Sequence, residues 1–378
     1  MKILYISSEN VPGITGGSVR TLEITRALKK RGHNVTIFTN RTRNQKRSET
    51  IDGMKVIRSK IRFGKTFPLL GVKRLDIFHK DFDVVIERYS IFGGIGTIYS
   101  KFHGKPLVLE VNAPHLEEAI ATEAIKGRIF ALAARKWRDI QFRTAAKIIT
   151  TKSSLVRGYK QKAVEVVLGG VNIDIFNQRL RKSNKVKSIR KMYGLEGSFV
   201  IAFQGAFTKW HGITDLTKAV NILEGKDTNI KFLLIGSGEL EKSAKSLAGN
   251  NCIFVGKKDH NEMPYYLAAC NAGVAPYGIL PKHLKYIGFY WTPMKVFEYM
   301  ALGLPVVTAD YKELRAIVGK NGLYYRPGDY NALAKALIKI KQMKRRKASV
   351  KKYSWDVQAK ELDVILKGLI KNANHALP

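Results

Sequence analysis

Three things are scarce in this 378-residue sequence: cysteine, acidic side chains and long apolar runs. The two cysteines, Cys252 and Cys270, are too few for a disulfide framework or a zinc cluster, so we expect a reducing, cytoplasmic setting. No stretch approaches the roughly 18 uninterrupted apolar residues that a membrane-spanning helix needs. Residues 1–9 turn acidic too soon for a signal peptide, and we expect them to form a first buried strand.

The shortage of acid leaves the chain strongly basic. Its 66 lysines and arginines outnumber 30 aspartates and glutamates, which gives a net charge of +36. The excess is dense in residues 20–74, with 16 basic and three acidic side chains, and in residues 335–352, with nine basic and none acidic. Such patches attract nucleic acid, anionic lipid headgroups or polyanionic substrates. A generally basic surface without a specific partner is an equal alternative.

What the sequence does contain is an alternation of short runs rich in Val and Ile with stretches of helical period. Runs that are apolar on both faces are typical of parallel sheets covered by helices. Two successive series of five predict two doubly wound α/β domains, residues 1–170 and 171–354, joined near residues 168–174. The expected strands are 1–8, 34–39, 83–89, 106–112, 147–151, 199–205, 231–236, 252–256, 272–276 and 305–309. An amphipathic helix that begins at Trp355 closes the chain.

A glycine-rich turn follows the first expected strand and precedes a helix. At such a turn, Gly16 and Gly17 let backbone N–H groups approach a phosphate or a sugar. The G-x-G-x-x-G spacing of a dinucleotide site is missing, so a plain surface loop is an equal alternative.

Residues 288–301 hold a sharper pattern. Thr292 is a candidate N-cap and Pro293 suits a first helical position, so we expect a helix to begin here. Lys295 and Glu298 are three residues apart and share one face of that helix. A cation beside exposed helix N–H groups would hold a diphosphate, and a carboxylate one turn later would accept hydrogen bonds from a ribose diol. The alternative is a surface ion pair on an otherwise buried helix.

Residues 292–307, TPMKVFEYMALGLPVV, closely resemble the donor-site segment of family 4 glycosyltransferases, which have the GT-B fold. Four further pieces resemble this family in the same order: Gly16-Gly17, 110–114 (EVNAP), 170–176 (GVNIDIF) and 205–212 (GAFTKWHG). The resemblance covers essentially the whole chain. It implies two Rossmann-like domains that face each other across a cleft, with the acceptor bound by residues 1–170 and the donor by residues 171–354. The C-terminal helix, 355–378, would return to the first domain.

The activity that the resemblance implies is a retaining, metal-independent glycosyl transfer without a cofactor. A hexose-type sugar would move from a nucleotide-diphosphate sugar to a saccharide or lipid-linked acceptor, and the leaving diphosphate would help to deprotonate the acceptor. By analogy Glu298 binds the ribose hydroxyls and Lys295 adds charge near the phosphates. The implied donor-binding residues are Gly16, Gly17, Gly205, Gly288, Phe289, Tyr290, Lys295 and Glu298.

Three departures from the family pattern affect these expectations. Tyr290 stands where the first of two glutamates, eight positions apart, is usual. Ala206 replaces an arginine and His211 a lysine, so Lys209 or His211 is left to provide the charge that faces the diphosphate. Asn112 replaces a histidine that often follows the fifth strand. The predicted catalytic residues are therefore Lys209, His211 and Asn112.

The first domain offers candidates for binding the acceptor and a membrane. His115, Glu87 and Arg88 are acceptor candidates, although Glu87 and Arg88 also suit a buried structural pair. Residues 61–75 combine seven large apolar side chains with four basic ones and no acid, which suits an element that dips into an anionic bilayer. An ordinary loop that packs into the core is the alternative. We expect a peripheral enzyme on the inner face of the cell membrane.

Other function classes have less support in the sequence. Asp81 and Asp83 imitate a metal-binding D-x-D motif but stand before a strand, and the histidines lack metal-ligand spacing, so no metal is expected. A nucleotide-sugar epimerase on the same fold, which needs no acceptor, is the nearer alternative. No recognition module accompanies the basic runs, so no nucleic-acid partner is expected.

Overall fold

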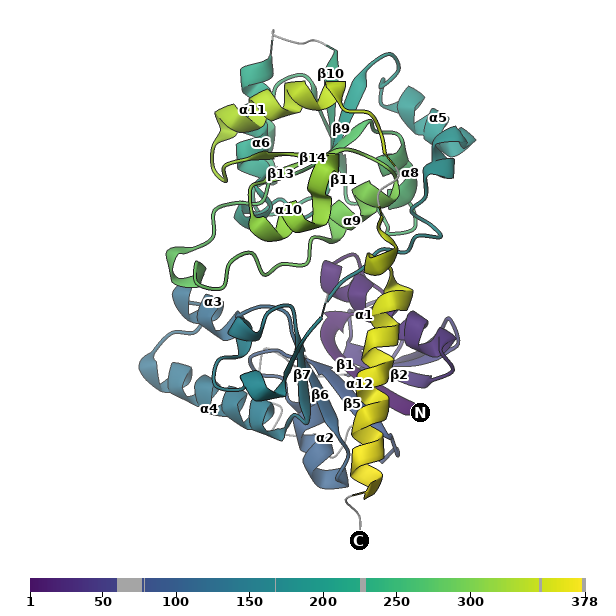
Figure 1. The fold of residues 1–378 in the computed structure, drawn as a ribbon, viewed down its shortest axis with the longest axis vertical. Helices are drawn as coiled ribbons and strands as arrows, with labels where there is room; N and C mark the ends of the chain where they lie inside the picture. Colours follow the sequence, from purple (N-terminus) through teal and green to yellow (C-terminus); the bar gives the residue numbers. More distant parts are fainter. Residues whose placement is uncertain (60–76, 78, 167, 225–228, 347–348, 376–378) are drawn as a thin grey trace. The chain divides into compact units, whose positions relative to one another are not determined.

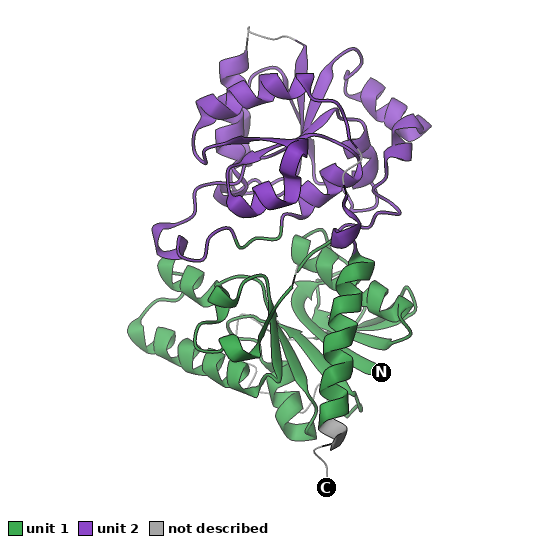
Figure 2. Ribbon diagram, in the orientation of Figure 1, with its two compact units in different colours: residues 1–170, 290–292, 355–378 green, residues 171–289, 293–354 purple. Residues whose placement is uncertain are grey.

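The structure is a computed structural model that describes residues 1–59, 77, 79–166, 168–224, 229–346 and 349–375 (Figure 1). The chain divides into two compact α/β units, each with its own sheet (Figure 2). Unit 1 consists of residues 1–170, 290–292 and 355–378, and unit 2 consists of residues 171–289 and 293–354.

An eight-stranded sheet forms the centre of unit 1, with the strand order β3-β4-β2-β1-β5-β6-β7-β8. Neighbouring strands are parallel except β3 and β4, which form an antiparallel hairpin. The strands are β1 (Lys2–Asn10), β2 (Asn34–Asn40), β3 (Ser48–Ile51), β4 (Met54–Ser59), β5 (Val84–Arg88), β6 (Leu107–Val111), β7 (Lys147–Thr150) and β8 (Ala163–Glu165). The chain order reverses between β1 and β5, which is where doubly wound sheets bind ligands at the carboxyl ends of their strands.

Apolar side chains on both faces of the central strands hold unit 1 together. Ile3, Leu4 and Ile6 of β1 are fully buried, as expected for an interior parallel strand covered by helices. The helices of unit 1 are α1 (Gly16–Lys30), α2 (Ile95–His103), α3 (His115–Ala121), α4 (Arg128–Thr144) and α12 (Trp355–His375). Helix α12 packs against α1, which confirms that the C-terminal helix returns to the first domain.

Unit 2 is built on a six-stranded parallel sheet with the order β11-β10-β9-β12-β13-β14. Counted from β9, this is the 3-2-1-4-5-6 order of a doubly wound nucleotide-binding fold, with the reversal between β9 and β12. The strands are β9 (Phe199–Gln204), β10 (Ile230–Ile235), β11 (Cys252–Gly256), β12 (Ala272–Ala275), β13 (Val306–Ala309) and β14 (Gly322–Tyr325). The helices are α5 (Asn184–Met192), α6 (Ile213–Leu223), α7 (Glu241–Leu247), α8 (Met263–Ala268), α9 (Met294–Ala301), α10 (Lys312–Val318) and α11 (Tyr330–Lys339).

The two doubly wound domains and all ten expected strands are confirmed, and four further strands, β3, β4, β8 and β14, were not predicted. Strand β3 (SETI) is mostly polar and has no buried position, and β4 (MKVIRS) is largely buried but contains Lys55, Arg58 and Ser59, so neither has the all-apolar pattern on which the prediction relied. The turn between the two strands is formed by Asp52 and Gly53, both with positive φ, a pairing typical of a two-residue hairpin loop. No helix in the described part of the chain is long and apolar enough to span a bilayer.

Candidate functional site

A buried cation lies at the point in unit 2 where the strand order reverses. Lys295, in the first turn of α9, is only 7% exposed. Its Nζ donates a hydrogen bond to Nδ1 of His211 at 3.0 Å and lies above the rings of Phe203 and Tyr277, 4.7 and 5.2 Å from their centroids. No carboxylate of the described residues forms an ion pair with Lys295. The nearby carboxylate of Glu298 offsets only part of the cost of burying this ammonium, so the arrangement favours binding of an anion.

Burial and the charge of Lys295 set the pKa values of Lys295 and His211. Desolvation lowers the pKa of Lys295 to about 7, with only partial compensation from Glu298. The charge of Lys295, together with burial, lowers the pKa of His211 to about 3, so the imidazole is neutral and accepts the lysine hydrogen bond. His211 therefore does not itself supply positive charge. The cation at this place is Lys295.

Glu298 lies one turn further along α9 and is 5% exposed. Its Oε2 accepts a hydrogen bond from Nε2 of Gln204, the last residue of β9, which fixes the carboxylate at the end of that strand. Burial raises the pKa of Glu298 to about 7 against the opposing effects of Gln204 and Lys295. We call Lys295, Glu298, Gln204 and His211 the Lys295 cluster.

Glycine at position 205 keeps the space beside the Lys295 cluster open. Gly205 follows β9 with φ of 139°, a conformation that other residues rarely adopt. A Cβ at this position would lie 3.0 Å from Nζ of Lys295 and 3.4 Å from Nδ1 of His211. Any larger residue would therefore crowd the charged group.

The other residues that the sequence predicted for catalysis and donor binding in this part of the chain have different surroundings. Lys209 begins a short 3-10 helix (Lys209–His211) and is exposed, whereas His211 contacts Lys295. Gly288 has φ of 73°. Phe289 is buried in unit 2 between Tyr277 and Tyr311, with ring centroids 4.9 and 5.2 Å away, so its side chain is part of the core.

Tyr290, at the position of the absent glutamate, belongs to unit 1 with residues 291–292. Its hydroxyl donates to Oε1 of Glu118 on α3, and its carbonyl accepts from Oγ1 of Thr151 at 3.1 Å. The side chain is 1% exposed, and burial followed by the hydrogen bond to Glu118 raises its pKa. The expected capping by Thr292 is wrong: Pro293 occupies the N-cap of α9, which has no side-chain cap bond.

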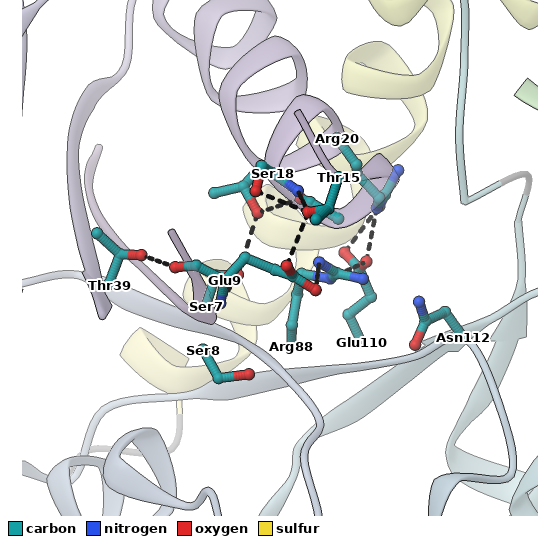
Figure 3. A network of polar contacts seen from close by, with 12 residues as sticks. Ser7, Ser8, Glu9, Thr15, Ser18, Arg20, Thr39, Arg88, Glu110 and Asn112 are labelled. Atoms are coloured by element: carbon teal, nitrogen blue, oxygen red, sulfur yellow. Dashed lines mark hydrogen bonds and ion pairs between the residues drawn. The ribbon is translucent and has the colours of Figure 1, made fainter. Parts of the chain in front are cut away.

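A second group of buried charges lies at the strand reversal of unit 1 (Figure 3). Glu110 of β6 is fully buried and receives hydrogen bonds from Nε and Nη2 of Arg20 at 2.5 and 2.8 Å, from Nε of Arg88 at 3.2 Å and from the Tyr5 hydroxyl at 3.0 Å. Nη1 of Arg88 also lies 3.7 Å from Oε1 of Glu9. We call Glu110, Arg20, Arg88, Tyr5 and Glu9 the Glu110 cluster.

The Glu110 carboxylate is fully compensated by its cationic neighbours, while Nη1 of Arg20 has no hydrogen-bond partner among the described residues. Burial opposes ionisation of Glu110, but the charges and hydrogen bonds of Arg20 and Arg88 outweigh it and hold the pKa of Glu110 below its ordinary value. Only the rim is accessible, with side-chain exposures of 34% for Glu9 and 11% for Arg88. This rim offers one carboxylate and one guanidinium that can exchange hydrogen bonds with ligand hydroxyls.

The two glycines of the N-terminal loop differ in their surroundings. A Cβ on Gly17 would lie 2.3 Å from Oε1 of Glu9 and 2.5 Å from Nη1 of Arg88. Only glycine therefore allows both side chains to pack this closely against the backbone at position 17. A Cβ on Gly16 would meet nothing within 4 Å. The loop is fixed by Thr15, whose hydroxyl caps α1 by accepting from the amide of Ser18 at 3.1 Å and also donates to Oε2 of Glu9 at 2.8 Å (Figure 3).

Asn112 and His115 form a pair just beyond β6. Nε2 of His115 donates to Oδ1 of Asn112 at 3.0 Å, and burial together with the charge of Arg88 lowers the pKa of His115 to about 4. His115 is therefore neutral at physiological pH. Both side chains are partly buried at the carboxyl end of the sheet, so their predicted contacts with substrate stay predictions.

Glu87 and Arg88 do not pair with each other, so the expected buried pair is wrong in its partners. Neighbouring residues of a strand point to opposite faces. Glu87 accepts from the amides of Gly94 and Gly96 at 2.7 and 3.0 Å, at the beginning of α2, and burial raises its pKa to about 7. The Glu87 carboxylate is 1% exposed and stabilises a helix terminus, whereas Arg88 joins the Glu110 cluster.

The described residues contain no group of three or more His, Cys, Asp or Glu side chains placed to hold a metal ion. The aspartates of the D-x-D sequence have structural partners: Oδ1 of Asp81 lies 2.9 Å from Nζ of Lys105, and Oδ2 of Asp83 accepts from the amide of Lys2 at 2.7 Å. The candidate membrane element, residues 61–75, lies outside the described residues.

Sequence reasoning assigned no role to Gln204, Arg20 or Glu9. Arg20 had a partial signal, because Glu110 stands in an apolar strand and a buried carboxylate needs a cation or several hydrogen-bond donors as partners. Gln204 had none: a glutamine at the end of a strand gives no hint that it fixes a carboxylate 94 residues later in the chain.

Comparison with known proteins agrees with this fold. Residues 14–175 match the family model described as "Glycosyltransferase Family 4", and residues 198–342 match the one described as "Glycosyl transferases group 1". The capsular polysaccharide biosynthesis glycosyltransferase CapM of Staphylococcus aureus is 24% identical over 293 residues, which cover 71% of this chain and 70% of CapM.

Solved structures share the fold over nearly the full chain. Sucrose-phosphate synthase of Thermosynechococcus elongatus superposes with a TM-score of 0.73 at 19% identity, covering 98% of this chain and 99% of that one. Anabaena Alr3699/HepE, solved in complex with UDP and glucose, has a TM-score of 0.64 at 17% identity and covers 100% and 99%. At these identities the structural likeness shows the fold alone.

Proposed function

The chain belongs to the group 1 glycosyltransferases of family 4, with the GT-B fold, and we propose that it is a retaining enzyme that uses a nucleotide-diphosphate sugar. In this proposal unit 2 binds the donor, unit 1 binds the acceptor, and a hexose-type sugar passes to a saccharide or lipid-linked acceptor. The CapM relative, named for capsular polysaccharide biosynthesis, and HepE, solved with UDP and with UDP-glucose, support this class of substrates.

The observation that carries the proposal is the buried ammonium of Lys295, whose charge Glu298 compensates only in part. A diphosphate would supply the missing negative charge and would raise the pKa of Lys295, because an adjacent anion favours the protonated amine. Amides at the beginning of α9 add further donors for phosphate oxygens. Glu298, held by Gln204 one turn away, would accept hydrogen bonds from the two ribose hydroxyls.

The chemistry requires no strong base from the protein. The bond between sugar C1 and the diphosphate oxygen breaks, and the acceptor oxygen bonds to C1 on the same face. The acceptor proton passes to an oxygen of the leaving diphosphate. Lys295 stabilises the charge that develops on this leaving group, and such preorganised electrostatic stabilisation is a large part of catalysis in a buried site. No metal ion or cofactor has a step in this scheme.

Unit 1 would orient the acceptor. Glu9 and Arg88 at the rim of the Glu110 cluster present an acceptor and a donor of hydrogen bonds, and the remainder of the cluster holds Arg88 in place. Asn112 and neutral His115 lie at the same end of the sheet. We further propose that the enzyme works in the cytoplasm on the inner face of the cell membrane, where a lipid-linked acceptor would be presented.

Product analysis tests the proposed reaction. The protein is incubated with UDP-, GDP- and ADP-sugars and a panel of nitrophenyl glycosides as acceptors, and the products are followed by proton NMR. We expect release of one nucleoside diphosphate, a product with the anomeric configuration of the donor, and no loss of activity in EDTA. An inverted product would contradict retention, and loss of activity in EDTA would contradict metal independence. A free epimerised sugar from donor alone would identify an epimerase.

A further inference from the structure

Helix α4 in unit 1 exposes an unusual set of large apolar side chains. Ile129, Phe130 and Leu132 are 82%, 64% and 54% exposed, and Ile140 is 40% exposed. The helix lies at the edge of unit 1 (Figure 1). Single exposed apolar residues are common on protein surfaces, but several within one helix indicate an interaction site.

The spacing places most of these residues on one face. Ile129, Leu132 and Ile140 follow one another at intervals of three and eight residues, which bring side chains to the same side of an α-helix. The opposite face is already packed: Ala134 is fully buried, and Phe142 is 3% exposed with its ring 5.3 Å from the centroid of Tyr89. The exposed face is therefore not needed for the core of unit 1.

Basic side chains surround this apolar face. Residues 126–144 contain six lysines and arginines and a single acid, Asp139. Asp139 forms an ion pair with Arg138, and Oδ1 of Asp139 lies 3.2 Å from Nη2 of Arg138. Four of the cations, Lys126, Arg128, Arg135 and Lys136, are exposed, and within the described chain none of them has a hydrogen-bond or ion-pair partner.

We propose that the outer face of α4, formed by Ile129, Leu132, Lys136, Ile140 and the flanking cations, docks on the surface of an anionic lipid bilayer. Apolar side chains would enter the boundary between headgroups and acyl chains, while the cations would meet lipid phosphates. A second copy of the chain fits this face poorly, because it would bring two sets of unpaired cations together. The surface deepens the membrane location proposed above and is independent of the sugar-transfer step.

Flotation with lipid vesicles tests the docking surface. At low ionic strength, we expect the full chain to float with equimolar phosphatidylcholine and phosphatidylglycerol and to remain unbound with phosphatidylcholine alone. The paired change Ile129→Ser and Leu132→Ser should reduce the fraction bound to anionic vesicles about tenfold or more. The pair Arg135→Glu and Lys136→Glu should have a similar effect, because each basic residue near such a surface contributes about one half to one order of magnitude in partitioning.

A matched control comes from α5 in unit 2. Lys191 and Met192 are both exposed, Met192 by 71%, so Lys191→Glu with Met192→Ser alters one charge and one apolar side chain away from α4. This control should float like the unaltered protein. All variants should keep the same thermal unfolding midpoint and the same nucleotide affinity, which separates failure of docking from failure of the donor site.

Three results would overturn the docking surface. The first is absence of flotation by the unaltered chain while nucleotide binding is intact. The second is flotation of both α4 variants at the level of the α5 control. The third is sedimentation of the unaltered chain as a dimer that the serine pair dissociates without changing vesicle binding, because this would assign α4 to contact between copies.

Discussion

Burial has opposite consequences for the charged residues of the two clusters. Glu110 is fully buried but accepts hydrogen bonds from two arginines and a tyrosine, so it stays ionised and holds these neighbours in place. Lys295 is also buried, but its direct contacts are a neutral imidazole and two aromatic rings, and Glu298 compensates its charge only in part, so its pKa drops to about 7. Satisfied buried charge indicates a structural support, whereas unsatisfied buried charge indicates a place for a ligand.

Substitutions of Gly17 and Gly16 test whether the positions of Glu9 and Arg88, at the rim of the Glu110 cluster, matter for sugar transfer. Gly17→Ala would push the carboxylate of Glu9 and the guanidinium of Arg88 aside, because the added methyl group would come within 2.5 Å of both. These are the ends of flexible side chains, so the fold should survive. We expect kcat/KM for transfer to fall about tenfold or more, since small displacements of positioning groups are costly.

Gly16→Ala is the matched control, because its methyl group meets no atom within 4 Å. Its kcat/KM should stay within about twofold of the unaltered protein, and both variants should unfold within a few degrees of it. Equal activity of the two variants would show that the arrangement of Glu9 and Arg88 has no part in transfer.

At the level of elements, the sequence allowed most of the architecture to be predicted. Strands such as β1 and β9 are apolar on both faces, and this pattern is visible without a structure. The hairpin of β3 and β4 was missed because polar residues interrupt both strands, although β4 is largely buried. The sequence prediction placed the beginning of α9 one residue too early. The pair Thr292-Pro293 suits an N-cap and a first helical position locally, but tertiary packing places Thr292 in unit 1, and the N-cap is Pro293.

A buried carboxylate of helix α12 contributes to its attachment to unit 1, in addition to buried apolar side chains of the helix. Asp363 is 2% exposed and binds Arg31 and Lys367, each at 3.0 Å, and Nε2 of His33, also at 3.0 Å. Burial opposes its ionisation, but the hydrogen bonds from Lys367 and Arg31 outweigh this effect and hold the pKa of Asp363 below its ordinary value. The second ion pair of the helix, Lys30 with Asp356, is exposed on both sides.

This contrast predicts unequal effects of two similar substitutions. Asp363→Asn should lower the free energy of unfolding by about 2 kcal/mol, because it leaves buried donors without a charged acceptor. Asp356→Asn should change it by less than about 0.5 kcal/mol, as is usual for an exposed pair. Chemical denaturation of both variants, with hydrogen exchange of the α12 amides, measures the difference.

The pH dependence of the Asp363 effect has a definite sign. A carboxyl group whose folded pKa is depressed stabilises the fold above its unfolded pKa, and this stabilisation disappears as the pH falls through the folded pKa. The difference between the unaltered chain and Asp363→Asn should therefore be full at neutral pH and shrink below about pH 4. A difference that is constant with pH would show that the carboxylate charge is not what fixes α12.

For the molecule as a whole, the resemblance of ordered motifs predicted the family and the two-unit fold, but composition alone did not. Taken alone, a net charge of +36 is equally compatible with binding to nucleic acid, with binding to a membrane and with a generally basic surface. The exposed apolar side chains of α4 are what favour a membrane for the basic residues of that helix. The separate sites were harder to predict, because partners such as Gln204 and Glu298 lie far apart in the chain and meet only in the folded unit. Motif spacing showed Lys295 and Glu298 but not their surroundings.

The central claim is that the Lys295 cluster binds the nucleotide diphosphate of the donor. Calorimetric titration of the full chain with UDP, GDP and ADP, repeated with Lys295→Met and with Lys335→Met as an exposed lysine control, tests it most directly. We predict saturable binding of one nucleotide, weakened at least tenfold (about 1.4 kcal/mol) by Lys295→Met and unchanged by Lys335→Met. Binding that is insensitive to Lys295→Met, or no binding of any nucleotide, would contradict the assignment of the donor site.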